Sequence, residues 1–247
     1  MIHIKTKEQI EIMKDVCKRT KILLNNLILK TEVGDTGVDI NTRAKKLFEI
    51  FDVESAFFGL YGFPAQLCIS VNENLVHGIP DSRPFEEGDK ITYDIGARLN
   101  GFCSDMARTF ILGTPKDETH VKLIKDTQEG LDAGIAQIKE GVALVEIART
   151  IENVALKYKY GNIDDYGGHG IGEQVHQDPH VSNSVRKAKP VILIAGMTIA
   201  LEPMYMLGGT KLIGDGKWNI KSEDGSIGCH LEDCILVKKD GYEILTR

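Results

Sequence analysis

The chain has 247 residues, of which 42% are hydrophobic and 27% charged, and this balance is typical of a soluble protein with a packed core. The composition excludes disordered, collagen-like and disulfide-framework proteins, since only 5 residues are cysteine and 7 are proline. Acidic residues (36) outnumber basic ones (30), which gives a net charge of −6 and argues against nucleic acid as the main ligand, because such binders are usually strongly basic.

The sequence contains no export or membrane signal. Its first 26 residues carry charges every few positions and lack the apolar core of a signal peptide. The longest apolar stretch, around 191–201, is shorter than the roughly 20 residues that span a membrane. The cysteines form no CxxC pair, which indicates reduced thiols. We therefore expect a cytoplasmic protein that does not associate with membranes.

Two helices are predicted at the start of the chain. Apolar residues recur at three- and four-residue steps over 7–29 and again over 38–50, and Thr6 with Gln9 is typical of a capping box. The composition then shifts to Gly, Pro, Asn and β-branched residues. This shift predicts strands at 67–71, 91–98 and 102–111.

The same order of elements then occurs a second time. Helical patterns return at 118–139 and 143–159, and a Gly-rich, strand-like stretch fills 163–247. Two pairs of landmarks agree on the offset within one residue: Ile40 and Ile147 are 107 positions apart, and Asp94 and Glu202 are 108 apart. The chain is therefore predicted to be one α+β domain, residues 1–247, built from duplicated halves of roughly 1–112 and 113–247. A site at the junction of the halves is expected.

A hairpin brings two aspartates together. The Asn-Gly pair at 100–101 predicts a two-residue turn, which places Asp94 opposite Ala107 and Asp105 opposite Gly96. In this register both carboxylates lie on one face, a diagonal step apart. They would repel each other unless a cation lay between them, so the pair predicts a metal site. The alternative is a pair of exposed surface charges.

The second half offers further ligands. His169 and His176 lie in a Gly-rich segment, Glu202 ends an apolar run, and Glu232 precedes another. Four carboxylates and one imidazole suit two divalent ions, because a lone zinc site usually holds more nitrogen or sulfur. Such a centre activates water and polarises a carbonyl or phosphoryl group, so the residues alone leave peptidase, phosphatase and nuclease open. The predicted ligands are Asp94, Asp105, His169, Glu202 and Glu232.

Five segments resemble type I methionine aminopeptidases, in order and over nearly the whole chain. They are Cys68-Ile-Ser-Val-Asn-Glu-Asn-Leu-Val-His77-Gly-Ile-Pro80, the hairpin from Asp94 to Asp105, Gly168-His-Gly-Ile-Gly with His176 and Asp178-Pro179, Leu201-Glu-Pro-Met204, and Leu231-Glu-Asp233. The resemblance implies the pita-bread (creatinase/aminopeptidase) fold, in which two pseudo-symmetric helix–helix–sheet halves surround a curved antiparallel sheet. It implies removal of the initiator methionine from nascent proteins whose second residue is small and uncharged.

The resemblance also assigns roles to individual residues. It implies that the five predicted ligands hold two divalent ions, which could be Co, Mn, Fe(II) or Zn. By the same resemblance His77 contacts the substrate near the scissile amide and helps the leaving amine, and His176 stabilises the oxyanion. Glu202 would also act as general base. Phe63, Cys68 and Trp218 fall where the family lines its methionine pocket.

The chain departs from the family at a few positions. Relatives commonly carry Gln, His and Thr where this chain has His230, Asp233 and Cys234, and a tyrosine where it has Phe63. His230 is expected either to contact the metal ligands without binding the metals itself or simply to form a different hydrogen bond. Asp233 would add negative charge near the site.

The sub-type and two alternative functions complete the expectations about activity. With no Cys/His extension before the first helix and only 26 positions from His176 to Glu202, the chain resembles the minimal bacterial form. An X-prolyl aminopeptidase or dipeptidase of the same fold usually has an added N-terminal domain. A non-catalytic pita-bread binding protein typically loses metal ligands.

The resemblance suggests a monomer that acts on N-terminal methionyl peptides and nascent chains and binds no nucleic acid stably. A transient ribosome contact could use the basic loop 186–189.

Overall fold

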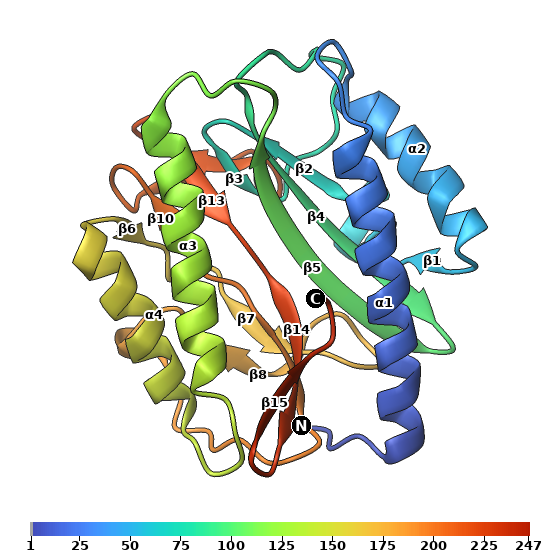
Figure 1. The fold of residues 1–247 in the computed structure, drawn as a ribbon, viewed down its shortest axis with the longest axis vertical. Coiled ribbons are helices and arrows are strands. Elements are labelled where there is room, and N and C mark those ends of the chain that lie inside the picture. Colours follow the sequence, from blue (N-terminus) through green and yellow to red (C-terminus); the bar gives the residue numbers. More distant parts are fainter. Residues whose placement is uncertain (1) are drawn as a thin grey trace.

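Two pairs of helices cover one side of a set of antiparallel sheets (Figure 1). The computed structural model describes residues 2–247. One pair packs on the strands of the first part of the chain and the other on those of the second part. The helices are α1 (Lys7–Leu29), α2 (Gly37–Ile50), α3 (Glu118–Ala136) and α4 (Leu144–Tyr158).

The four predicted helices are confirmed, and local sequence explains their starts. The Thr6 side chain accepts from the Gln9 backbone N–H while the Gln9 side chain accepts from the Thr6 N–H, as the capping box predicted. The third helix ends at Ala136, three residues earlier than predicted. The apolar pattern continues through Ile138, but this residue is buried in a turn that leads to Gly141 at φ +85°.

A long hairpin organises the first sheet, in which β4 pairs with all three other strands. Its register agrees with the prediction: Asp94 faces Ala107 and Asp105 faces Gly96. The three strands predicted in this region are confirmed within one residue at each end. The sheet contains β1 (Glu54–Ser55), β2 (Cys68–Val71), β4 (Lys90–Leu99) and β5 (Phe102–Ile111).

The second part of the chain forms a five-stranded antiparallel sheet in the order β15-β14-β9-β7-β8. Its strands are β7 (Gly168–Gly170), β8 (Gln177–Val181), β9 (Thr198–Leu201), β14 (Asp233–Lys238) and β15 (Gly241–Ile244). Two small three-stranded sheets, β13-β10-β6 and β11-β12-β3, lie beside it. They contain β3 (Asn74–Val76), β6 (Gly161–Asn162), β10 (Met204–Met206), β11 (Leu212–Ile213), β12 (Ile220–Ser222) and β13 (Gly228–His230).

The two parts of the chain meet where Glu232 forms an antiparallel bridge with Ala107 of β5. Beside this junction, β3 from the first part pairs with β12 from the second. The segment that connects the parts, 113–117, runs between β5 and α3 and is largely exposed. The α+β prediction is confirmed, while the duplication into halves of 1–112 and 113–247 stays a prediction. No helix within residues 2–247 is both long and apolar enough to cross a membrane.

Candidate metal centre

The five predicted ligands come from different strands and converge at the junction of the sheets. Asp94 lies in β4, Asp105 in β5 and His169 in β7, while Glu202 directly follows β9 and Glu232 directly precedes β14. All five are buried. Because each residue sits in a strand or at its end, the backbone ladders fix where its side chain points.

The ligand atoms of the five predicted ligands form two overlapping groups, and a third group joins Asp105 and His169 to His176. Those of His169, Glu202 and Glu232 all lie within 4.8 Å of one another, and so do those of Asp94, Asp105 and Glu232. Glu232 belongs to both groups. This arrangement suits two cations that share a carboxylate.

The imidazole of His169 is fixed in orientation. Its Nδ1 lies 3.0 Å from the backbone oxygen of Gly170, to which it donates. Its Nε2 therefore faces the carboxylates, 3.7 Å from Glu202 Oε1 and 3.8 Å from Asp105 Oδ2. The tautomer set by this hydrogen bond leaves a lone pair on Nε2 for a metal.

The electrostatics of the carboxylates match a cation site. Burial raises the pKa of Asp94 to about 7, and burial together with neighbouring carboxylates raises the pKa of Asp105 and of Glu232 well above the usual range. One oxygen of each of these three side chains is buried without a hydrogen bond. Buried polar atoms of this kind are rare unless something binds them, and a divalent ion would satisfy all three.

Asp233 does not leave an unpaired charge beside the centre. Its Oδ1 lies 2.6 Å from an Arg108 guanidinium nitrogen, and its Oδ2 lies 2.6 Å from Nε of Arg247. Arg108 also donates to the backbone oxygen of Glu232 at 2.6 Å. The charge that the sequence predicted near the site is therefore neutralised, and the same contacts hold the backbone of a predicted ligand in place.

A cavity of about 300 Å³ opens over this cluster and is lined by all five predicted ligands. The remaining predicted site residues, His77, His176, Phe63, Cys68 and Trp218, also line it. One wall is aromatic: the rings of Phe63 and Trp218 are 5.0 Å apart between centroids, and those of His77 and Trp218 are 6.0 Å apart. The cavity thus has an apolar wall and a charged floor.

His77 reaches the cavity through an unusual backbone conformation. Its φ is +57°, in the left-handed region, and its Nδ1 lies 3.2 Å from the backbone oxygen of Lys217. The ring meets Tyr166 edge-on at 5.3 Å. Partial burial lowers the pKa of His77, so the imidazole is neutral at pH 7.

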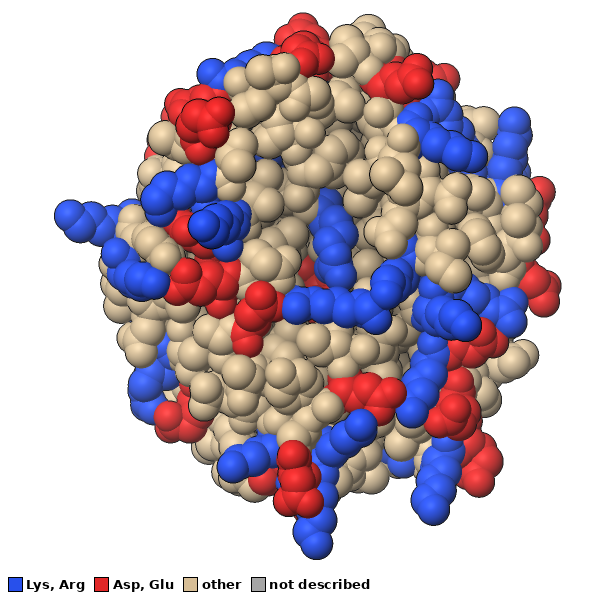
Figure 2. Space-filling view, viewed as in Figure 1, with Lys and Arg blue, Asp and Glu red and all other residues tan. Residues whose placement is uncertain are grey.

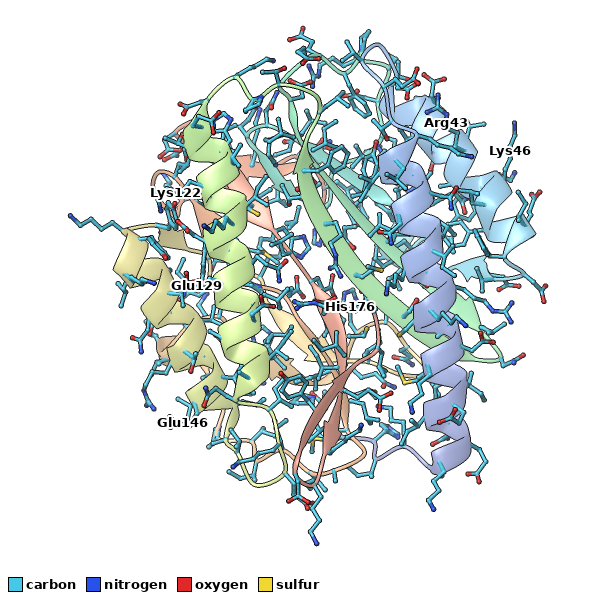
Figure 3. All side chains as sticks on the ribbon, viewed as in Figure 1. Arg43, Lys46, Lys122, Glu129, Glu146 and His176 are labelled. Carbon is cyan, nitrogen blue, oxygen red and sulfur yellow. The ribbon has the colours of Figure 1, made fainter. Side chains whose placement is uncertain are left out.

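His176 stands beside the predicted ligand His169, with ring centroids 4.5 Å apart, and stacks on Tyr61 at 5.8 Å. Partial burial and the nearby His169 lower the pKa of His176. Figure 3 shows the side chain near the middle of the molecule in projection, between α1 and α3. Its place at the rim allows contact with both solvent and a bound substrate.

Several further cavity residues were not predicted as site residues, among them Tyr61, Tyr166 and His180. Tyr166 could have been noticed, because it directly precedes the Gly-Gly-His run. Tyr61 could not, since its contact with His176 depends on a left-handed backbone at φ +52° that no local signal marks.

Comparison with known proteins gives consistent matches. The model of metallopeptidase family M24 matches residues 11–239. A methionine aminopeptidase from Clostridium acetobutylicum is 37% identical, with 100% of this chain and 99% of that protein covered. The crystal structure of methionine aminopeptidase from Thermotoga maritima is 36% identical, with a TM-score of 0.96 over 100% of both chains. The prolidase from Pyrococcus furiosus shares the fold at a TM-score of 0.82 and 24% identity, with 99% of this chain but only 65% of that one covered.

Proposed function

Because the chain belongs to metallopeptidase family M24 and matches methionine aminopeptidases over its full length, we propose that it is a metal-dependent methionine aminopeptidase. The predicted resemblance and the predicted pita-bread fold are confirmed. The observation that carries the proposal is the buried group of four carboxylates and one imidazole on the floor of an aromatic-walled cavity.

The residues present fit divalent ions. Membership of the family implies metal binding, and we propose two ions held by Asp94, Asp105, His169, Glu202 and Glu232, since two groups of ligand atoms share Glu232. Bound divalent ions supply Lewis acidity for the peptide carbonyl and lower the pKa of water. Three unpartnered carboxylate oxygens support this assignment. Co, Mn, Fe(II) and Zn all suit an oxygen-rich site with one imidazole.

The protein's own groups would position the substrate and move protons. Glu202 offers a carboxylate on the cavity floor that can accept a proton from the attacking water. His176, at the rim beside His169, can donate an N–H to the scissile carbonyl oxygen as negative charge develops there. His77, on the aromatic side of the cavity, can contact the scissile amide and assist the departing amine.

The aromatic side of the cavity suits a methionine side chain. Phe63 and Trp218 present ring surfaces, and Cys68 contributes a buried sulfur whose pKa burial raises, so that it stays an uncharged thiol. Thioethers pack well against such surfaces. We propose that these three residues bind the first side chain and that the second residue of the substrate must be small and uncharged.

The partner assignments also remain proposals: a cytoplasmic monomer acting on methionyl peptides and nascent chains. The basic loop 186–189 gives limited support for ribosome contact. Arg186 and Lys187 both pair with Asp164, at 2.7 and 3.1 Å, and Lys187 pairs with Asp165 as well. Two of its three cations are thus already partnered.

The alternatives are less well supported. An X-prolyl peptidase would share the fold, but the prolidase is 24% identical to this chain, against 37% for the aminopeptidase from Clostridium acetobutylicum. A non-catalytic binding protein would have no need for five converging ligands. A phosphatase or nuclease would not account for full-length similarity to aminopeptidases.

Peptide hydrolysis tests the proposal. Metal-free protein reconstituted with Co, Mn, Fe(II) or Zn should release methionine from Met-Ala-Ser and not from Met-Lys-Ser, and it should leave Ala-Pro peptides intact. Asp94→Ala should lower activity by at least about 100-fold, because it removes the carboxylate that β4 contributes to the proposed metal site. Failure to cleave Met-Ala-Ser with any metal would contradict the proposal, and cleavage of Ala-Pro alone would favour the X-prolyl alternative.

A further inference from the structure

A second buried histidine faces the carboxylate cluster. His230 ends β13, is 2% exposed and lines the cavity. Its Nε2 lies 3.2 Å from Glu202 Oε2 and 3.9 Å from Glu232 Oε2. It is one of the positions at which this chain departs from the family pattern, so its role does not follow from the resemblance.

The two histidines approach the same glutamates from opposite sides. His169 faces Oε1 of Glu202 and Oε1 of Glu232, at 3.7 and 4.0 Å, whereas His230 faces Oε2 of both. The Glu202 carboxylate is therefore bracketed by two imidazoles. A quarter turn about its last side-chain bond would carry both oxygens away from the two rings.

The backbone of His230 is held rigidly while its ring is free of other partners. The Thr109 hydroxyl donates to its backbone oxygen at 2.6 Å, and β13 pairs with β10 through His230 and Met204. Neither ring nitrogen has a hydrogen-bond partner, so the 3.2 Å approach of Nε2 to Glu202 Oε2 is a close polar contact without hydrogen-bond geometry. A buried imidazole with no other partner, aimed at a carboxylate, acts on that carboxylate or on what it binds.

We propose that His230 is a positioning residue that holds Glu202 Oε2, so that Oε1 faces His169 and the metal. The inference rests on the metal centre of the proposed function. His230 is not assigned as a ligand itself, because none of the three groups of ligand atoms within 4.8 Å includes it. Groups that orient metal ligands from behind typically contribute 10–100-fold to metal affinity.

Two substitutions separate positioning from other roles. His230→Gln keeps a neutral donor that can reach Glu202, and His230→Leu keeps the bulk but removes the donor. Cys229→Ala is the matched control, since this neighbour on the same strand packs into the apolar core below the second pair of helices. Affinity for Mn(II) and Co(II) is measured by calorimetry on the metal-free protein, and the visible spectrum of the Co(II) form reports ligand geometry.

We expect His230→Leu to bind Co(II) about 10–100-fold more weakly with an altered spectrum, and His230→Gln to bind within about 3-fold of the wild type. The control should bind like the wild type. Melting curves of the metal-free proteins show whether the Leu variant is folded; if it is not, His230→Ala, which also removes the donor, carries the test with the same expected loss.

Two results with the variants overturn the inference. Unchanged affinity in His230→Leu would show that the ring does not position Glu202. A loss in His230→Gln as large as in His230→Leu would show that an imidazole nitrogen itself binds the metal. A wild type that binds metal but releases no methionine would overturn the proposed function alone, whereas a wild type that binds no divalent ion would overturn both.

Discussion

Two glycines flank His169 where the neighbouring backbone leaves no room for a side chain. A Cβ on Gly168 would lie 2.2 Å from the backbone oxygen of Ala200, and one on Gly170 would lie 2.1 Å from that of Asp178. Both contacts are with main-chain atoms, which cannot rotate away. The glycines therefore allow β7 to pack between its neighbours with His169 pointing at the carboxylates.

Gly168→Ala should destabilise the protein by about 3 kcal/mol, since overpacking against a rigid backbone forces the strands apart. It should also weaken metal binding, because His169 moves with its strand. Urea denaturation and metal titration measure the two effects.

Gly209→Ala is the matched control for this prediction. Its nearest neighbour would be a side-chain oxygen of Asp224 at 3.4 Å, and its backbone is not left-handed. A change within about 0.5 kcal/mol is expected there. Equal effects at both positions would contradict the packing argument.

At the level of elements, Asp89 ties the start of β4 to three neighbouring segments. Its carboxylate accepts from Asn72, Arg83 and Lys116 at 2.8–3.0 Å and from the backbone N–H of Glu86. Burial alone would raise its pKa, but these hydrogen bonds outweigh burial and lower the pKa to about 2. The strand that carries Asp94 thus begins at a fixed point.

This pKa shift predicts a pH dependence of stability. A carboxyl whose pKa is lower in the folded state stabilises the fold fully above its unfolded pKa of about 4, and this contribution is lost as the pH falls toward 2. Asp89→Asn should cost about 2 kcal/mol at pH 7, a typical value for hydrogen bonds to a charged group. Its stability should then fall less steeply than that of the wild type between pH 4 and 2 (urea denaturation series).

The exposed turn residue Asp240 provides the comparison for this pH series. Asp240→Asn should leave the free energy of unfolding within about 0.5 kcal/mol of the wild type. A slope between pH 4 and 2 that is the same in Asp89→Asn as in the wild type would show that Asp89 is not the group responsible.

Long helices and strands could be predicted from the sequence, and short strands could not. The helices have enough turns to show their apolar stripe, and the Asn-Gly turn at 100–101 fixed the register that joins Asp94 to Asp105. The strands after residue 160 are mostly two to five residues long, too short for an alternating pattern. The pairing of β3 with β12 joins segments about 140 residues apart, which no local signal encodes.

The same contrast holds for the site. The predicted ligands could be found because carboxylates and glycines stand at the ends of apolar runs. The stacking of Tyr61 on His176 and the ion pairs of Asp233 with two arginines could not, because they depend on tertiary contacts. The negative charge of Asp233 was evident from the sequence, but its two guanidinium partners were not. Over the helices, basic and acidic side chains are intermixed (Figure 2), so the net charge alone described that surface poorly.

For the whole molecule, the proposed metal centre joins residues that range from 94 to 232 in the sequence. Ions that bind only the folded chain stabilise it by mass action, by about 2.7 kcal/mol at a free concentration 100-fold above Kd. For a chain of this size that amounts to a rise of about 5–10 °C in the melting temperature. Thermal melts with Mn(II) or Co(II), with and without chelator, measure it.

Asp94→Ala should abolish this rise and should not lower the melting temperature of the metal-free protein. Its carboxyl is buried with a pKa raised to about 7, so without metal its charge opposes folding. A metal-dependent rise that persists in this variant would contradict the assignment of Asp94.

The exposed connection at 113–117 divides the proposed metal ligands into two sets. Asp94 and Asp105 precede it, while His169, Glu202 and Glu232 follow it. A single cut there would leave two fragments, each holding part of the centre and joined through β5, Glu232 and the β3–β12 pair. Such a nicked protein would be a split enzyme, and the bound ions would determine how long its two fragments stay associated.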